Sequence, residues 1–427
     1  MSSKLARGGS EWRFAFSLAL ITLMSPCATD MYLASMPDIT RHMNVSYASV
    51  QLTLTVFLMA QGLGQIFFGP LIDRFGRRRP LLAGLVVFML ASVWAAGADS
   101  ITTLIVSRFV QGLSGALLLV VGFSSVRDVT DGADAARLFA ILMTIEGLAP
   151  IFAPIIGGYV DAWFGWRVVL LLSALMGAAA LANSFFFLPE TLAADQRLPL
   201  RPKVIAGTYK RIITDRAFLI PTLALSSVFF YLFAYIGGGA YLYQDIYQLS
   251  PDRFGLIFGA TGIAVMLGAV VNGRLVKSVA VSSVAVGGVV FIIIGTGVAL
   301  ISSLTVGMYG LAAGFVISMF GLGVVEPALM ALVMSSQKSA LGFTAALMGS
   351  LHLMLSSLST PVTGVLLPLS LTYWFVFLLM AAGISLGLTI WAGRLTAEEL
   401  RSKPKQVQPE PVQPEPAFSD FQPQNES

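Results

Sequence analysis

Between two long apolar runs the chain reads GPLIDRFGRRRP at residues 69–80. Gly69 permits two helices to approach closely, and Gly76 permits a tight turn. Asp73 can pair with a cation across a helix bundle, and a pair that breaks when two halves rock acts as a gate with two discrete states. A plain basic anchor at a membrane surface would explain the arginines alone, but it does not require glycine and aspartate at these spacings. The predicted gate comprises Gly69, Asp73, Arg74, Gly76, Arg77 and Arg78.

The whole chain is as apolar as the runs that flank this loop. Of its 427 residues, 56% are hydrophobic and only 11% are charged, whereas about a quarter of a soluble domain is charged. Such a chain could not cover a water-facing surface, so lipid must be its solvent. The apolar blocks are long enough to cross about 30 Å of hydrocarbon as helices, and the short alternating strands of a membrane barrel are missing. We therefore predict an all-α membrane protein.

Twelve apolar runs are predicted to be membrane spans. In the first half they cover residues 14–36, 48–70, 80–98, 101–125, 137–160 and 166–188. In the second half they cover residues 218–242, 253–273, 280–300, 305–333, 340–367 and 371–393. The predicted organisation is a cytoplasmic N-terminus (1–13), a six-helix bundle (14–188), a cytoplasmic linker (189–217), a second six-helix bundle (218–396) and a tail (397–427). The tail repeats Val-Gln-Pro-Glu-Pro and is predicted to be disordered.

Lysine and arginine determine the predicted orientation. With the N-terminus inside, all but four of the 26 lie in inside segments. Arg41, Arg167 and Arg253 lie outside, and Arg108 lies within a span. Both termini are therefore predicted to be cytoplasmic. The basic residues follow this rule rather than forming a nucleic-acid surface, so the net charge of +4 does not predict a nucleic-acid partner.

The two halves also echo each other in sequence. The fifth predicted span reads Pro154-Ile-Ile-Gly157, and its counterpart, the eleventh, reads Pro361-Val-Thr-Gly364. Two parallel six-helix repeats place a substrate cavity at their interface near the membrane midplane.

An acid and a base lie deep within two spans. By the helix rise, Asp30 lies about 24 Å from the inner end of the first span, and Arg108 lies about 10 Å from the outer end of the fourth. An acid inside a membrane span is costly and is a functional candidate. At similar depth the two residues could pair, and a carboxyl group balanced between such a pair and the cost of burial can take up and release a proton. The alternatives are a static ion pair or a water-solvated aspartate.

Further polar and aromatic residues are candidates for the cavity. Glu146, near the midplane, could attract a cationic substrate or relay protons, or it could be a protonated packing residue. Tyr231 and Tyr235 are four residues apart and share a helix face, which could line a hydrophobic cavity, although packing explains aromatic residues equally well. The predicted cavity residues are Tyr32, Gln111, Glu146, Tyr231 and Tyr235.

The loop at residues 69–80 resembles the signature loop of the major facilitator superfamily, which reads roughly G-x-L-x-D-R-x-G-R-R. Two further stretches, Asp30-Met-Tyr-Leu33 and Arg108-Phe-Val-Gln-Gly112, resemble the drug:proton antiporter branch, in particular Bcr/CflA-type exporters. The fifth span is similar to the antiporter motif of that branch, although Ala153 stands where the motif has glycine. The motif residues are Gly147, Pro154, Gly157 and Gly158. The resemblance extends to about residue 396.

This resemblance implies a multi-pass protein of a bacterial inner membrane that exports small amphipathic compounds, chloramphenicol- or bicyclomycin-like, in exchange for protons. Asp30 and Arg108 would serve in proton coupling. The expected partners are a small-molecule substrate, protons and the bilayer. We expect a monomer without cofactor or metal. An exporter dedicated to one endogenous metabolite or siderophore would use the same machinery, and a non-transporting membrane receptor or scaffold is a remote alternative.

An enzymatic function is not expected. Gly112-Leu-Ser-Gly115 matches the G-x-S-G of rhomboid intramembrane proteases, but the same residues fall within the fourth-span motif, where small residues let helices pack closely. The sequence has neither a P-loop nor an H-E-x-x-H motif.

Overall fold

The computed structural model describes residues 8–130, 132–337 and 340–402, and these residues form helices without any strand. The helices of the first half are α1 (Gly8–Thr22), α2 (Met24–Leu33), α3 (Met36–Met43), α4 (Tyr47–Phe75), α5 (Arg78–Ala96), α6 (Ile101–Val129), α7 (Gly132–Phe164) and α8 (Trp166–Phe187). The connecting segment holds a 3₁₀ turn, η1 (Ala194–Gln196), and α9 (Pro202–Ile213). The second half comprises α10 (Arg216–Tyr241), the π-turn η2 (Leu242–Ile246), α11 (Pro251–Leu275), α12 (Val281–Thr305), α13 (Met308–Ser335), α14 (Leu341–Ser357), α15 (Ser359–Leu369) and α16 (Leu371–Ser402).

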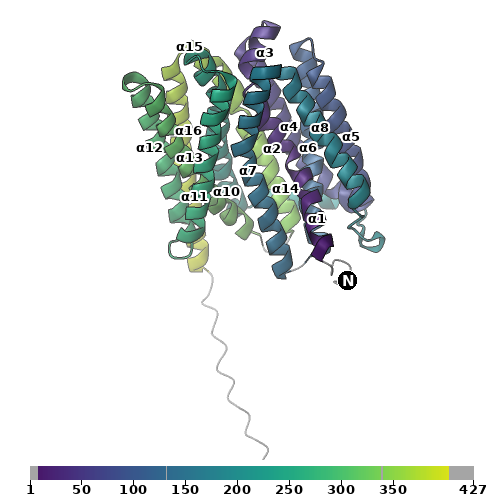
Figure 1. Ribbon diagram of the computed structural model, residues 1–427. Coiled ribbons are helices and arrows are strands. Elements are labelled where there is room, and N and C mark those ends of the chain that lie inside the picture. The colour runs from purple at the N-terminus through teal and green to yellow at the C-terminus, as the bar shows by residue number, and fades with distance from the viewer. Residues whose placement is uncertain (1–7, 131, 338–339, 403–427) are drawn as a thin grey trace, which may run out of the picture.

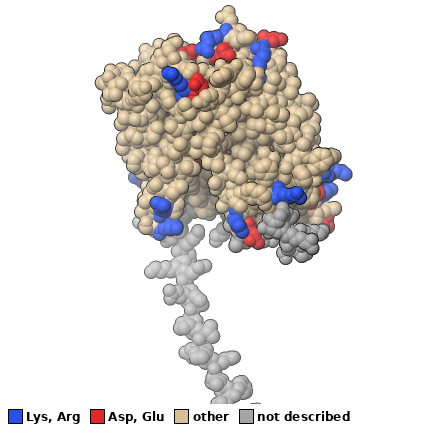
Figure 2. Space-filling model, viewed as in Figure 1, with Lys and Arg blue, Asp and Glu red and all other residues tan. Residues whose placement is uncertain are grey.

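The outer surface identifies lipid as the solvent of these helices. Among the described residues, eleven helical stretches are long and apolar enough to cross a membrane, and the bent pair α1–α2 provides a twelfth. Large apolar side chains point outward, with Phe186 73% exposed and Leu175 65% exposed. Lysine, arginine and acidic residues gather at the two ends, and an uncharged belt lies between them (Figure 2). The chain is therefore a multi-pass membrane protein with an all-α fold.

The two halves of the chain lie side by side (Figure 1). Helices of the first half, purple to blue, occupy one side, and helices of the second half, green to yellow, occupy the other. They meet where α7 packs on α11 and where α4 packs on α14 and α15. α1 begins and α16 ends at one end of the molecule, which we call the linker end, while α3 and α15 lie at the opposite end.

The glycines of the two Pro-x-x-Gly motifs make different contacts. Gly157 of the first motif packs on the backbone of Met31 in α2, within its own half. A Cβ on Gly158 of α7 would meet the carbonyl of Pro251 at the start of α11. In α15, a Cβ on Gly364 would lie 2.7 Å from the Cα of Ala48 at the start of α4. Only glycine allows backbones to approach this closely. On the α7 side the contact between the halves is therefore made by Gly158, the residue after the motif, whereas in the second motif Gly364 itself meets the other half.

Two spans are broken, and proline explains both breaks. The axes of Trp12–Thr22 and Met24–Leu33 differ by 43°. Pro26 has no N–H to donate to the carbonyl of Thr22, four residues earlier, and its ring crowds that carbonyl. In the eleventh span, Pro361 stands four residues after Ser357, the last residue of α14. The first span is therefore bent, whereas Leu341–Leu369 continues as one span past the interruption at Leu358.

The observed helices match the twelve predicted spans, with several differences at their ends. The second span continues to Phe75, so Gly69 and Asp73 of the predicted loop lie within α4. The first predicted span (14–36) is bent, and the short helix α3 follows it. The predicted linker (189–217) contains α9 and η1. The fifth span is longer than predicted, and α16 continues to Ser402, beyond the predicted end at 396. The remainder of the predicted tail, 403–427, lies outside the described residues.

Candidate functional site

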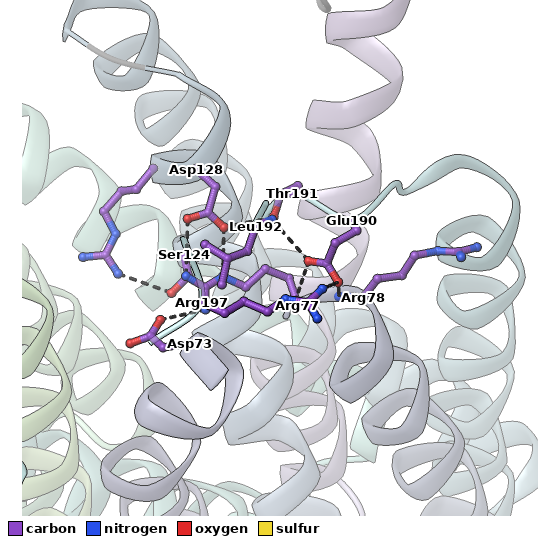
Figure 3. A network of polar contacts seen from close by, with 10 residues as sticks. Asp73, Arg77, Arg78, Ser124, Asp128, Glu190, Thr191, Leu192 and Arg197 are labelled. Atoms are coloured by element: carbon purple, nitrogen blue, oxygen red, sulfur yellow. Dashed lines mark hydrogen bonds and ion pairs between the residues drawn. The ribbon is translucent and has the colours of Figure 1, made fainter. Parts of the chain in front are cut away.

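A network centred on Arg77 holds the loop between α4 and α5 (Figure 3). The Nη1 of Arg77 donates to Oδ1 of Asp73 over 2.7 Å. Its Nε and Nη2 donate to Oδ2 and Oδ1 of Asp128 over 2.8 and 3.3 Å. The backbone N–H of Arg77 donates to Oε1 of Glu190 over 2.7 Å. The N–H donors of the planar guanidinium thus bind two carboxylates at once.

This network ties together the linker ends of three helices of the first half. Asp73 lies in the last turn of α4, Asp128 near the end of α6, and Glu190 just after α8. Burial alone would lower the pKa of Arg77, but the hydrogen bonds and charges of Asp128 and Asp73 raise that pKa above its ordinary value. Gly76 has a φ of +87° and faces the Glu190 carboxylate, where a Cβ would collide. The loop therefore requires glycine here for two reasons.

Two expectations about the gate loop are corrected. Asp73 was predicted to pair across the bundle, but it pairs with Arg77, one helical turn later in its own half. Gly69 was predicted to permit close helix approach, but a Cβ there would have open space around it. Arg78 donates to the carbonyl of Phe185 over 2.8 Å, and Arg74 is exposed.

Sequence reasoning missed Asp128 and Glu190 as the partners of Arg77. Both are acids at the end of the molecule that carries most of the basic residues. Acids in such surroundings are available to pair, and the ends of the second, fourth and sixth spans meet on the same side of a bundle. These two facts together could have identified them.

Arg108 is completely buried in α6, and it forms no ion pair with any carboxylate among the described residues. Its Nη1 donates to the carbonyl of Ala28 over 3.2 Å and to Oε1 of Gln111 over 2.6 Å. The guanidinium carbon lies 4.5 Å from the ring centre of Tyr32 and 4.3 Å from that of Phe57. Aromatic faces stabilise a desolvated cation in this arrangement.

Asp30 and Arg108 do not form the predicted ion pair, since none is found between them in the described part of the chain. Asp30 lies on α2, beyond the bend at Pro26, with 8% of its surface exposed. Its side chain has no hydrogen-bond partner among the residues that the structure describes. Arg108 donates instead to the backbone carbonyl of Ala28, in the same helix as Asp30.

Several predicted cavity residues are packed inside the halves. Gln111 is fully buried and donates to Ser92 over 2.7 Å. Tyr32 bonds to Thr53 over 2.7 Å. Tyr231 and Tyr235 share a face as predicted, but both are completely buried. The Tyr231 hydroxyl bonds to Thr296 over 2.6 Å, and the Tyr235 ring stacks on Phe258 at 5.5 Å. These two tyrosines therefore do not line a cavity in this conformation, because their shared face points into the second half.

Glu146, a predicted cavity residue, and His352, which was not among the predicted site residues, both lie within the spans. Oε1 of Glu146, on α7, is buried without a partner in the described structure. Nδ1 of His352 lies 3.1 Å from the carbonyl of Met348, and its ring lies 4.5 Å from that of Phe229. In the predicted antiporter motif, a Cβ on Gly157 would collide with the Met31 backbone, whereas a Cβ on Gly147 would have open space around it. Among the described residues, no group of potential ligands could hold a metal ion.

At the opposite end, side-chain hydrogen bonds join the two halves. Tyr47 and Gln51 of α4 both donate to the carbonyl of Gly237, over 2.7 and 2.5 Å. Gln244 donates to the carbonyl of Ala34 over 2.8 Å. The Arg41 guanidinium lies 2.9 Å from the Asp245 carboxylate, an ion pair that was not predicted.

Near the linker end, the contact between the halves involves α9. The Tyr209 hydroxyl donates to the carbonyl of Ile66 in α4 over 3.0 Å. The same ring packs edge-on against Phe343 of α14, with ring centres 5.2 Å apart. Burial, together with the charge of Asp73, raises the pKa of Tyr209 to about 12, so its hydroxyl stays protonated and able to donate. The lower edge of the molecule is indented between the two halves in the space-filling view (Figure 2).

Comparison with known proteins gives a consistent result. Residues 18–361 match the family model of the Major Facilitator Superfamily. An uncharacterized MFS-type transporter of Bacillus subtilis, YdgK, is 32% identical over 364 residues, which cover 84% of this chain and 90% of the relative. A bicyclomycin resistance protein homolog of Haemophilus influenzae is 33% identical over 270 residues, which cover 63% of this chain and 68% of the relative.

Among solved structures, a crystal structure of the nucleoside transporter NupG superposes with a TM-score of 0.71. The match covers 90% of this chain and 99% of that chain, at 14% sequence identity. A likeness at this identity concerns the fold alone. With its two six-helix halves, its signature loop and these relatives, the chain belongs to the Major Facilitator Superfamily.

Proposed function

We propose that this transporter exports small amphipathic compounds from the bacterial cytoplasm and takes up protons in exchange. The drug:proton antiporter motifs at Asp30 and Arg108 support this, as does the likeness to a bicyclomycin resistance protein homolog. The linker end is cytoplasmic in this proposal, because it carries most of the lysines and arginines. The substrates we expect are bicyclomycin- or chloramphenicol-like.

One observation carries the proposal: Asp30 is a buried acid on a bent span, and none of the described residues forms a hydrogen bond or an ion pair with its side chain. An unpaired carboxylate at such a site is costly when charged, so a change in its surroundings can drive proton uptake or release. Arg108, fixed on the neighbouring α6 by two aromatic rings, would favour the charged form whenever the carboxylate turned toward it. As the halves rock, Asp30 would thus alternate between a buried environment that favours its protonated form and a position near Arg108 that favours its charged form.

The proposed cycle assigns this structure to one of its states. The opposite end is closed by Arg41–Asp245 and by the bonds to Gly237, while Tyr209 of α9 bridges α4 and α14 near the linker end. In the proposal this is a state in which the opposite end is closed. The Arg77 network would hold the linker ends of α4, α6 and α8 as one rigid unit during rocking.

Flux in proteoliposomes tests the proposal. Purified protein is reconstituted, a pH gradient is imposed, and uptake of radiolabelled chloramphenicol is compared with and without a protonophore. We expect accumulation that the protonophore abolishes. Accumulation that survives collapse of the gradient would refute proton coupling. A screen of bicyclomycin and endogenous metabolites in the same vesicles would separate a drug exporter from one dedicated to a single metabolite.

A further inference from the structure

A groove lies at the linker end of the first half, between the ends of α4 and α5. Its volume is ≈ 410 Å³. Leu117 of α6 contributes to its apolar wall, together with Leu71 and Ala83. Three guanidinium groups line the same groove, those of Arg74, Arg79 and Arg197. A basic rim therefore adjoins an apolar wall.

The charges in this groove are poorly matched by the protein. In the described part of the chain, Arg74 and Arg79 form no ion pair. Arg197 has one acidic neighbour, Glu190, at 3.8 Å between Nη2 and Oε2. The buried Nε of Arg197 has no hydrogen-bond partner among the described residues. Three cations thus share one acid, and the groove is electropositive.

The chemistry of this lining specifies a ligand with two parts. Guanidinium groups bind phosphate oxygens through paired N–H donors. The apolar wall formed by Leu71, Ala83 and Leu117 suits a hydrocarbon chain that continues into the bilayer. Basic pockets between membrane helices bind the head groups of anionic lipids. We propose that this groove binds one anionic phospholipid, with its phosphate among the three arginines and an acyl chain along the apolar wall.

The proposed lipid would act on the Arg77 network through Arg197. The Arg197 guanidinium lies against Gly76, where a Cβ would be 3.0 Å from its Nη2. It also neighbours Glu190, whose carboxylate accepts the N–H groups of Arg77 and Arg78. A phosphate that holds Arg197 in place thereby supports the acid that fixes the loop. Bound lipid should therefore stabilise the loop, whatever compound the protein transports.

Native mass spectrometry of the purified full-length protein tests binding directly. Delipidated protein is titrated with phosphatidylglycerol, with phosphatidylcholine and with inorganic phosphate. The test variant carries Arg74→Gln, Arg79→Gln and Arg197→Gln. The control carries Lys203→Gln, Lys210→Gln and Arg211→Gln, which remove the same charge from exposed positions of α9. A second variant, Ala83→Trp, fills the groove and keeps every charge.

We expect phosphatidylglycerol to bind the wild type and the α9 control with similar affinity. Each groove arginine contributes about fivefold near an anionic head group, so the triple variant should bind on the order of a hundredfold more weakly. Ala83→Trp should also lose the lipid. Three results would each overturn the proposal: equal binding of phosphatidylcholine, equal loss in the α9 control, or displacement of the lipid by millimolar inorganic phosphate. Unchanged binding in both groove variants would overturn it as well.

Discussion

Arg108 keeps a positive charge in the core of the first half by contacts with neutral groups. Two aromatic faces and two oxygen acceptors surround its guanidinium. Desolvated cation–π contacts contribute about 2 kcal/mol or more, and the charge-assisted hydrogen bonds add to this. The arrangement depends on the planar shape of the group as well as on its charge.

Arg108→Lys should therefore destabilise the protein although it preserves the charge. A lysine ammonium cannot lie flat between the rings of Tyr32 and Phe57. We expect a loss of about 2 kcal/mol, measured as a lower unfolding midpoint in detergent. Arg137→Lys, at an exposed position of α7, is the matched control. If Arg108→Lys unfolds at the wild-type midpoint, the charge alone suffices and the stacking argument fails.

The two acids that share Arg77 should differ in importance. Asp128 is 11% exposed and Asp73 is 39% exposed. Removing a partner from a buried pair costs about 3–5 kcal/mol, whereas an exposed pair contributes about 0–1 kcal/mol. Asp128→Asn should thus lower the unfolding midpoint clearly more than Asp73→Asn. The reverse order in a parallel thermal melt would mean that Asp73 is the principal partner of Arg77.

For single residues, the sequence predicted the depth of a side chain in the membrane better than it predicted the residues that the side chain contacts. Helix rise placed Asp30 and Arg108 at similar depth, but the direction in which each side chain points depends on how the helices rotate against each other. The rings of Tyr32 and Phe57 decide that direction for Arg108, and Phe57 was not recognised as a contact. Tyr231 and Tyr235 share a face as predicted, but the sequence could not decide which neighbour that face meets.

Proline positions explain the shape of the spans at the scale of whole elements. Pro26 removes the hydrogen bond to the Thr22 carbonyl, and the 43° bend at that point sets the direction of α2, which carries Asp30. The proposed function requires the surroundings of the Asp30 carboxyl group to change during the cycle. A broken span allows α2 to move independently of α1. The bend is thus a structural requirement of the proposed cycle.

Pro26→Ala should straighten this span and reduce transport. It restores a backbone hydrogen bond, and a proline inside a helix costs about 3 kcal/mol. We therefore expect an equal or higher unfolding midpoint, together with a transport rate reduced by at least about tenfold. Pro199→Ala, in the exposed connecting segment, should change neither property. Wild-type flux in Pro26→Ala vesicles would show that the bend is dispensable.

The spans were predictable because twenty apolar residues in a row have few alternatives to a membrane helix. α9 was missed because its twelve residues mix basic and apolar side chains, and a hydropathy criterion does not detect such a segment. α3 escaped for the same reason, with Asp38 and Arg41 in a helix of eight residues. Amphipathic helices at a membrane surface require periodicity rather than mean hydropathy to be recognised.

At the scale of the whole molecule, the two halves are joined by hydrogen bonds at the opposite end and bridged by α9 near the linker end. The closure at the opposite end uses a modest ion pair, Arg41–Asp245, with side chains 57% and 27% exposed. Such a pair contributes about 0–1 kcal/mol, which is suitable for a contact that must break in every cycle. None of the sequence motifs identified this pair, because its members lie 204 residues apart.

Reversing the charges of this pair should shift the population of states. Arg41→Asp adds a third acid beside Asp38 and Asp245 and should favour opening of the opposite end. The double variant Arg41→Asp/Asp245→Arg should restore closure. Spin labels at Asn44→Cys and Gln248→Cys, in a Cys27→Ser background, report the distance between the halves by pulsed EPR. A double variant as open as the single variant would contradict a gating role for the pair.

The most direct test of the central claim compares two transport modes in Asp30→Asn. The substitution removes the titratable group at nearly constant volume, and Asp195→Asn, at an exposed position of η1, is the matched control. We predict that uphill accumulation driven by a pH gradient disappears in Asp30→Asn while substrate exchange between equal concentrations continues. The control should retain both modes. Undiminished gradient-driven accumulation in Asp30→Asn would contradict the account and remove Asp30 from proton coupling.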